Sequence, residues 1–236
     1  MSVDPYDNSQ IVKIYEERYN TDSRVKFEIL HEIDVVRKTL IESKHSSWCD
    51  VACGTGFHLR NLDTNLFLED LKKVGLDKSS LMIDTYKQPE DDIEFIVADL
   101  LDYQVKETYD LTTNFWFGYS HQQSLKDVMK FFDKMVELTS TNGSMILSIH
   151  NQWGMFNQYP YHFSEPMGGD FKFEAMVWSY CEPGFPEAIY NCIVPHRDLI
   201  KEHLLKHFES VSITSYPPQS GPGGKELVIA KGRMNE

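Results

Sequence analysis

The fold is decided by one stretch of the chain, Trp48-Cys49-Asp50-Val51-Ala52-Cys53-Gly54-Thr55-Gly56-Phe57-His58-Leu59. In it, an apolar strand ends in an acid, a turn of small residues follows, and a helix begins. Gly54 and Gly56 let the backbone turn tightly and approach a ligand without a Cβ atom in the way. The N–H groups and the positive end of the following helix favour an anionic or polar group. The stretch therefore predicts a ligand site at the end of a strand.

The spacing of the glycines argues against a dinucleotide site. A dinucleotide-binding turn reads G-x-G-x-x-G, and its third glycine allows close packing of helix on strand. Counted from Gly54, that third position is Leu59, and from Asp50 to Gly56 the chain instead reads Asp-x-Ala-x-Gly-x-Gly. This resembles motif I of the class I methyltransferases that depend on S-adenosylmethionine (SAM), with Ala52 in place of the family's usual first glycine. A tight turn in an unrelated α/β domain is the alternative.

Two more strand ends fit the same resemblance. Asp77 ends the short strand 73–77, 21 residues after Gly56, and Asp99 and Leu100 follow a strand at 93–97. An acid at the end of the second strand is placed to accept hydrogen bonds from ribose hydroxyls. The resemblance assigns the ribose to Asp77 and the adenine to Asp99 and Leu100. For Asp77, capping of a helix that starts near Ser79 is the alternative.

The resemblance implies SAM as the cofactor. In the first helix, Tyr15 and Arg18 offer an aromatic hydroxyl and a guanidinium to the carboxylate of its methionine part, although the same spacing fits an ordinary amphipathic helix. The expected cofactor-binding residues are Tyr15, Arg24, Asp50, Ala52, Gly54, Gly56, Asp77, Lys78, Asp99, Leu100 and Phe115.

Composition narrows the class of partner. The chain has 236 residues and a formal charge of −13 at pH 7, and none of its Lys/Arg clusters is longer than a pair. Nucleic-acid binding draws its affinity from cationic residues. The segment Asn114-Phe115-Trp116-Phe117 also lacks the prolines typical of methyltransferases that act on nucleic-acid amino groups. We expect a small-molecule substrate and neither a nucleic-acid nor a membrane partner, with a homodimer left open.

The location is expected to be cytoplasmic. No apolar run reaches the ~18 residues needed to cross a bilayer, and the polar N-terminus does not resemble a secretory signal. Cys49, Cys53, Cys181 and Cys192 form no C-x-x-C pair. Two of them lie in the glycine-rich stretch, where a disulfide would be disruptive, so a reducing compartment is indicated.

Strand and helix patterns alternate along the chain and predict a single α/β domain over residues 1–236. Expected helices cover 9–20, 23–41, 122–138 and 195–207, and residues 140–143 are expected to form a turn. Because a last strand reached by a loop alone runs antiparallel to its neighbour, we expect a Rossmann-like, seven-stranded, mostly parallel sheet with helices on both faces and an antiparallel last strand. The expected strands are 47–51, 73–77, 93–97, 109–115, 144–149, 210–216 and 226–231.

The stretch 151–192 is too long for a simple connection. It is rich in aromatic residues, and its part 171–180 alternates apolar and polar residues as an extra strand would. We expect this aromatic insertion after strand five to form a cap that covers the substrate. Residues 1–42 are expected to form an N-terminal helical lid. A small satellite core or a dimer face is the alternative. The aromatic residues are Trp153, Phe156, Tyr159, Tyr161, Phe163, Phe171, Phe173, Trp178, Tyr180, Phe185 and Tyr190.

Methyl transfer needs an aligned nucleophile and a group that removes its proton. His121, on the loop after strand four, is the first candidate, and His150, at the end of strand five, is the second, because histidine titrates near working pH. Tyr119 is expected to orient the acceptor or to accept a hydrogen bond. A purely structural role is the alternative for each histidine.

His203 and His207 stand one helical turn apart, a spacing that suits zinc. The pattern suggests no third ligand, so we expect a surface pair and no metal site.

The sequence therefore predicts a SAM-dependent methyltransferase that acts on N or O of a small, amine-bearing molecule. The residues of motif I, the Phe-Gly-Tyr loop and the inserted cap resemble those of the amino-sugar N,N-dimethyltransferases. A nucleotide-dependent oxidoreductase is one alternative, weakened by Leu59 and by the lack of a Tyr-x-x-x-Lys pair. A non-catalytic scaffold with the same fold is the other.

Overall fold

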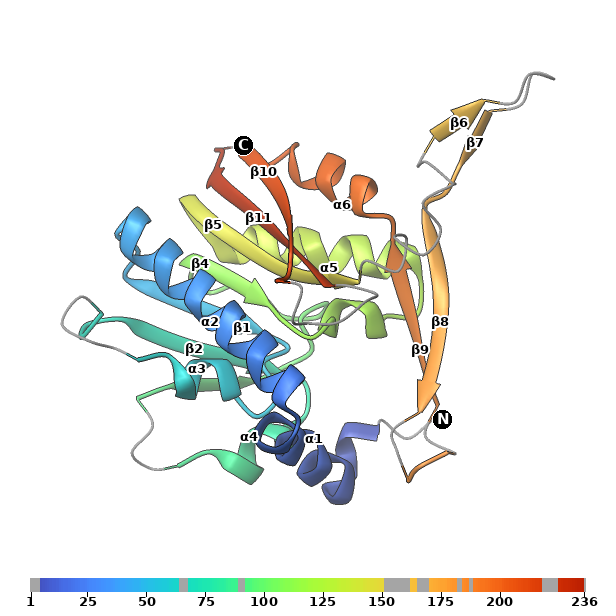
Figure 1. The fold of residues 1–236 in the computed structure, drawn as a ribbon. Helices are drawn as coiled ribbons and strands as arrows, with labels where there is room; N and C mark the ends of the chain where they lie inside the picture. The colour runs from blue at the N-terminus through green and yellow to red at the C-terminus, as the bar shows by residue number, and fades with distance from the viewer. Residues whose placement is uncertain are drawn as a thin grey trace.

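The computed structural model describes residues 5–63, 68–88, 92–150, 162–164, 170–181, 184–186, 189–217 and 225–235 (Figure 1). Its centre is a seven-stranded sheet with the order β10-β11-β5-β4-β1-β2-β3. Strands β3, β2, β1, β4 and β5 run parallel, whereas β11 is antiparallel to both β5 and β10. The strands are β1 (Ser47–Val51), β2 (Lys72–Asp77), β3 (Glu94–Val97), β4 (Tyr109–Asn114), β5 (Thr139–His150), β10 (Phe208–Ser215) and β11 (Lys225–Arg233). The predicted sheet is confirmed.

Helices cover both faces of this sheet, with α2 on one face and α5 on the other (Figure 1). On α2, the apolar residues Val25, Ile29, Val36 and Leu40 recur close to helical spacing, and all four are buried in the core of their face. The opposite core is built by α5 and α6. The helices are η1 (Pro5–Asp7), α1 (Ser9–Thr21), α2 (Ser23–Ser43), α3 (Phe57–Asn61), α4 (Ser80–Tyr86), η2 (Gly118–His121), α5 (Leu125–Leu138) and α6 (Arg197–Leu204).

Several predicted boundaries are wrong. The helix predicted over 122–138 begins at Leu125, and the helix predicted over 195–207 ends at Leu204. The residues expected to form a turn at 140–143 lie within β5, which begins at Thr139. They form an irregularity in which Asn142 has a φ of 63° and the pairing with β4 jumps from Tyr109–Thr139 to Leu111–Ser144. Asn tolerates the left-handed region, so the turn chemistry produces a bulge within the strand.

The last helix begins later than predicted. Pro195 ends strand β9 and pairs with Ala175 across the hairpin, and α6 starts at Arg197. The Nδ1 atom of His196 accepts the N–H of Asp198 at 3.1 Å and caps the helix.

The described parts of the insertion form two antiparallel hairpins, β6 (His162–Ser164) with β7 (Asp170–Lys172) and β8 (Ala175–Cys181) with β9 (Ile189–Pro195). The strand expected over 171–180 is therefore divided between β7 and β8. The hairpin β8–β9 stands beside the main sheet (Figure 1). Trp153, Phe156, Tyr159 and Tyr161 lie outside the described residues. Within the described part of the chain, every helix is too short or too polar to cross a membrane.

Candidate functional site

The turn between β1 and α3 takes three residues through the left-handed region. Ala52, Gly54 and Gly56 have φ values of 52°, 57° and 72°. A Cβ atom on Gly54 would lie 2.9 Å from Cε of Met82, and one on Gly56 would lie 2.7 Å from the Phe95 ring. The backbone conformation favours glycine at both positions, and at Gly56 the close approach to the Phe95 ring adds to this preference.

Asp77, at the end of β2, holds this turn in place. Its buried carboxylate accepts the N–H of Gly54 at 2.7 Å and that of Ser79 at 2.8 Å. The cap of α4 is Ser79, whose hydroxyl accepts the N–H of Met82 at 3.2 Å. Capping of α4 is thus carried out by Ser79, and Asp77 fixes the turn to the sheet edge.

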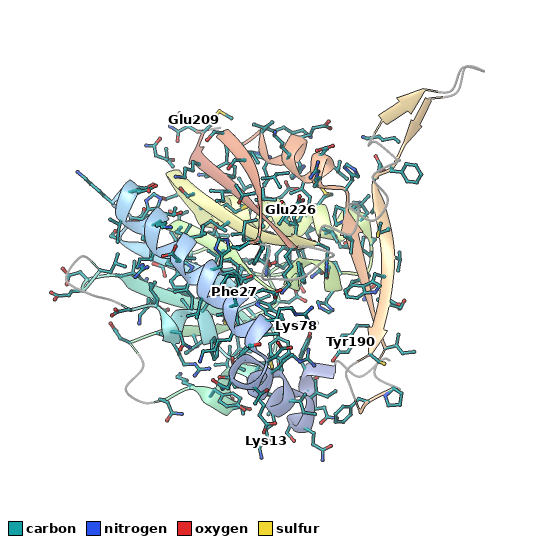
Figure 2. The ribbon with its side chains drawn as sticks, viewed as in Figure 1. Lys13, Phe27, Lys78, Tyr190, Glu209 and Glu226 are labelled. Carbon is teal, nitrogen blue, oxygen red and sulfur yellow. The ribbon has the colours of Figure 1, made fainter. Side chains whose placement is uncertain are left out.

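A pocket opens at the carboxyl ends of β1, β2, β3 and β4. Most predicted cofactor residues line it, together with Tyr6, Met82, Trp116 and Gly118. Lys78 and Tyr190 lie toward the same end of the molecule, near α1 (Figure 2). The predicted residues in the lining are Tyr15, Ala52, Gly54, Asp77, Lys78, Asp99, Leu100, Phe115 and His121.

The other predicted cofactor residues lie beside or outside this lining. Asp50 borders an adjoining recess with Tyr19 and His58. It is buried and accepts the hydroxyl hydrogen of Thr113 at 2.6 Å. Burial raises the pKa of Asp50 to about 6. Gly56 is the residue that precedes α3, and Arg24 is exposed in the first turn of α2.

The turn after β4 is strained and anchored. Trp116 and Phe117 have φ values of 55° and 64°, a conformation that costs a non-glycine residue about 1–2 kcal/mol. The side chain of Asn114 donates to the carbonyl of Val51 at 2.7 Å and accepts the N–H of Tyr119 at 3.3 Å, which ties this turn to the end of β1. Strain of this kind concentrates at functional sites.

A buried carboxylate on α2 joins the N-terminal helices to this turn. Glu32 accepts from the Trp116 indole at 3.2 Å, meets Nε2 of His58 at 2.7 Å, and accepts the Tyr216 hydroxyl hydrogen. Burial alone would raise the pKa of Glu32, but the hydrogen bond and charge of His58 and the charge of Lys225 hold it below the usual value. A second buried acid, Glu16 of α1, binds the Thr55 hydroxyl at 2.5 Å and the Arg60 guanidinium at 2.7 Å.

Lys225 supplies the cation beneath the pocket wall. Its Nζ atom lies 2.6 Å from a Glu28 carboxylate oxygen and 3.5 Å from the centroid of the Trp116 ring. Both side chains of the ion pair are largely buried, at 16% and 5% exposure. The Trp116 ring is therefore fixed on one side by a cation–π contact and at its N–H by Glu32.

Of the three predicted catalytic residues, His121 lines the pocket. Its ring contacts those of Tyr6 and Tyr190, with centroids 5.9 and 5.7 Å apart, and these two rings are 5.7 Å from each other. Three elements far apart in the sequence, η1, η2 and β9, thus build one aromatic cluster. We call Tyr6, His121 and Tyr190 the aromatic box.

His150 and Tyr119 are placed differently. The His150 ring stacks on Phe117 with centroids 3.4 Å apart and meets Trp178 of β8 edge-on at 5.0 Å. Burial, assisted by the charges of Lys225 and His121, lowers the pKa of His150 to about 3. Tyr119 is fully buried in the core against Phe132. Neither residue belongs to the pocket lining.

Sequence reasoning missed several residues of the site. Tyr6, Trp116 and Gly118 line the pocket, and Glu32 and Lys225 hold Trp116 from behind. The only local signal was the aromatic run after β4, because Glu32 and Lys225 reach the site through contacts between distant segments.

Comparison with known proteins agrees with this geometry. Residues 49–143 match the family model described as a methyltransferase domain. A search of curated protein sequences gives no match.

Solved structures share the fold at low sequence identity. The N-methyltransferase NodS from Bradyrhizobium japonicum WM9, in complex with S-adenosyl-L-homocysteine (SAH), superimposes with a TM-score of 0.59 at 12% identity over 93% of this chain and 91% of that one. The glycopeptide N-methyltransferase MtfA, complexed with SAH, gives 0.62 at 12% identity over 85% and 88%. DesVI from Streptomyces venezuelae gives 0.59 at 14% identity over 95% and 98%.

Residues 49–143, which include motif I, Asp77 and Asp99, thus match a methyltransferase domain. The fold of the whole chain is that of solved SAM-dependent methyltransferases.

Proposed function

We propose that the protein transfers a methyl group from SAM to a nitrogen or oxygen atom of a small, amine-bearing molecule. One observation carries the proposal: the glycine turn, Asp77 and His121 all line one pocket. Cofactor-binding and proton-accepting groups thus share one space at the carboxyl ends of the parallel strands, where α/β sheets bind ligands.

The residues of the pocket fit SAM. A Cβ atom on Gly54 would crowd Met82, another residue of the lining, so the glycine keeps this part of the pocket open. A carboxylate has about four acceptor positions, so Asp77 can hold the turn and bind ribose hydroxyls together. Asp99 and the backbone N–H of Leu100 are assigned to the adenine, and Tyr15 and Lys78 to the methionine part.

When bound, SAM supplies a methyl group on a positively charged sulfur, which is a good leaving group for an in-line displacement. The tasks left to the protein are to align the acceptor and to remove its proton. We assign the removal of the acceptor's proton to His121. His150 has a pKa near 3 and therefore stays neutral at working pH, so we assign it to positioning the Phe117 turn and the β8–β9 hairpin.

The aromatic box favours an amine-bearing acceptor. Aromatic faces attract ammonium and methylated ammonium groups, and the chain's charge of −13 favours cationic molecules over polyanions. This acidic character also argues against a nucleic-acid substrate.

The segments around the pocket are assigned to covering it. Tyr6 and Tyr15, from residues 1–42, and Tyr190 and Trp178, from the β8–β9 hairpin, reach the pocket or the histidines beside it. We assign the first segment to the lid and the hairpin to the substrate cap. Val177 and Ile189 of the hairpin are 69% and 63% exposed, which favours a homodimer contact there. A cytoplasmic location is supported by Cys49, Cys53, Cys181 and Cys192, all of which are free thiols.

Calorimetry and turnover test the proposal in two steps. The protein is titrated with SAM, SAH, NAD and NADP, and we expect binding of SAM and SAH alone. It is then incubated with SAM and a panel of small amines and alcohols, and SAH release is measured by mass spectrometry. Binding of NAD without SAM would favour an oxidoreductase, whereas SAM binding without turnover on any acceptor would favour a non-catalytic scaffold.

A further inference from the structure

A second cluster of ligand-type side chains lies where α5, α6 and the start of β10 meet. Asp133 of α5 joins His203 of α6 and His207, the residue before β10. The histidines alone are a pair one turn apart, and folding adds the carboxylate that the sequence pattern does not indicate. We propose that Asp133, His203 and His207 form a binding site for a divalent transition-metal ion, with Zn²⁺ as its best probe.

The distances suit this assignment. One ligand atom from each residue lies within 4.8 Å of the other two, and Nε2 of His203 is 2.7 Å from Oδ1 of Asp133. Zinc bonds of about 2.0–2.2 Å in a tetrahedron place ligand atoms roughly 3.3 Å apart. Small side-chain rotations therefore convert the hydrogen-bonded cluster into a coordinated one. Asp133 is free to rotate because its side chain is 49% exposed.

The backbone beneath the three ligands is rigid. Each ligand is next in sequence to a residue that is at most 1% exposed and anchored in the same core, namely Phe132, Leu204 and Phe208. The N–H of His207 also donates to the carbonyl of Leu204 at 2.9 Å, and the carbonyl of His207 accepts the N–H of Met234 at 2.8 Å. A site on such a frame needs little reorganisation to bind a metal.

The donor set selects the metal. Two imidazoles and one carboxylate suit zinc and its neighbours in the first transition row, with a fourth position left to water. Magnesium and calcium prefer oxygen ligands throughout.

The site is separate from the methyltransferase pocket. None of its ligands belongs to the pocket lining, and α6 lies at the end of the molecule opposite to α1 and α4 (Figure 1). A metal there would join α5 to the junction of α6 and β10. Its expected effect is on stability, with methyl transfer unchanged.

Calorimetry on the chelator-treated full chain tests the site. We expect saturable binding of one Zn²⁺ per chain and no heat with Mg²⁺. His207→Gln and Asp133→Asn should each weaken zinc binding at least tenfold, since each removes one of three ligands. His45→Gln is the matched control, because His45 is a partly buried histidine bonded to Ser144 outside the cluster, and its zinc affinity should equal that of the wild type.

A thermal readout separates the site from other zinc-binding groups. Excess Zn²⁺ should raise the unfolding midpoint of the wild type and of His45→Gln by several degrees, but not that of His207→Gln. Circular dichroism checks the fold of each variant. If Asp133→Asn does not fold, the result for His207→Gln alone tests the site. The proposal is overturned if no zinc binds, if His207→Gln binds zinc like the wild type, or if binding disappears in a Cys181→Ser variant, since Cys181 is the exposed thiol.

Discussion

A Cβ atom placed on Gly118 would lie 2.6 Å from the Cβ atom of Ala52, closer than such atoms approach in folded proteins. Ala52 occupies the position at which motif I of the family has glycine, and it does so at a φ of 52°. The turn after β4 therefore makes room for the extra methyl group of the turn after β1. The two turns form one packed unit at the edge of the pocket.

This contact predicts that substitutions at Ala52 and Gly118 have coupled effects on stability. Gly118→Ala should destabilise the protein by about 1–3 kcal/mol through overpacking. In an Ala52→Gly background the same substitution should cost less, because the closest contact is gone. Urea unfolding of the two single variants and the double variant measures the coupling. Equal costs of Gly118→Ala in both backgrounds would mean that Asn114, which a Cβ atom on Gly118 would meet at 2.8 Å, dominates.

Asp77 should matter more for the cofactor than for the helix that follows it. Asp77→Ala removes the acceptor of the Gly54 N–H and the proposed ribose ligand, and leaves buried donors unpaired. We expect SAM affinity to fall by about 5–150-fold, corresponding to about 1–3 kcal/mol. Ser79→Ala is the matched control, since it removes the cap of α4 and should lower stability by about 1 kcal/mol with little change in SAM binding. Similar losses of SAM affinity in both variants would make Asp77 a structural residue.

Lys225 should be essential to stability because it neutralises the buried carboxylate of Glu28. Removing one member of a buried ion pair leaves an uncompensated charge and costs about 3–5 kcal/mol. Lys225→Met should therefore lower the free energy of unfolding by about that amount, and Glu28→Gln in the same chain should restore much of it. Chemical unfolding of the three variants provides the test. If the second substitution restores nothing, the cation–π contact with Trp116 is the stabilising interaction.

His150 predicts a loss of stability in acid. Its folded pKa, near 3 because of burial, lies below the value of about 6.5 expected in the unfolded chain. Between these values the unfolded state binds a proton that the folded state does not, so stability falls as pH falls through that window. His150→Phe should lose less stability than the wild type between pH 7.5 and pH 5, measured by urea unfolding. An unchanged pH dependence would assign the acid sensitivity to other groups.

The parts of the fold that follow from local pattern were predictable. Strand β1 and the ends of β2 and β3 were found because short apolar runs end at a small-residue turn or an acid, and these signals lie within a few residues. The start of β5 was missed because turn residues also suit a bulge, and only pairing with β4 decides between them. Sequence pattern alone carries no record of such pairing.

The residues of the site also fall into two groups, those that local sequence signals indicate and those that only contacts between distant segments bring in. Asp77, Asp99 and Leu100 were predicted because they follow successive strands at positions that match the methyltransferase pattern. Glu32 meets Trp116 and Tyr216 at separations of 84 and 184 residues, which no local pattern indicates. Tyr119 was expected to orient the acceptor, but the short η2 helix directs its side chain into the core and that of His121 into the pocket. A three-residue turn places residues two apart on different sides.

The assignment of the proton acceptor gives the last prediction. His121 lines the pocket, whereas His150 is stacked on Phe117 with a strongly lowered pKa. Losing a general base costs about 10²–10⁴ in rate. His121→Ala should therefore lower the single-turnover rate by that order while SAM affinity stays at the wild-type value. An acceptor amine that is already neutral in the pocket needs only alignment. The drop in rate caused by His121→Ala should therefore be smaller with such an amine than with an alcohol acceptor.

The matched variant is His150→Ala, measured across the same pH range. Single-turnover conditions isolate the chemical step from product release, which otherwise hides the effect. Because the pKa of His150 is near 3, its removal should leave the pH profile between 5 and 8 unchanged even if the rate falls. Loss of His121 should remove the rise in rate that follows deprotonation of an imidazole. If His121→Ala keeps the wild-type rate and profile while His150→Ala loses both, the base lies at the end of β5 and the aromatic box serves binding alone.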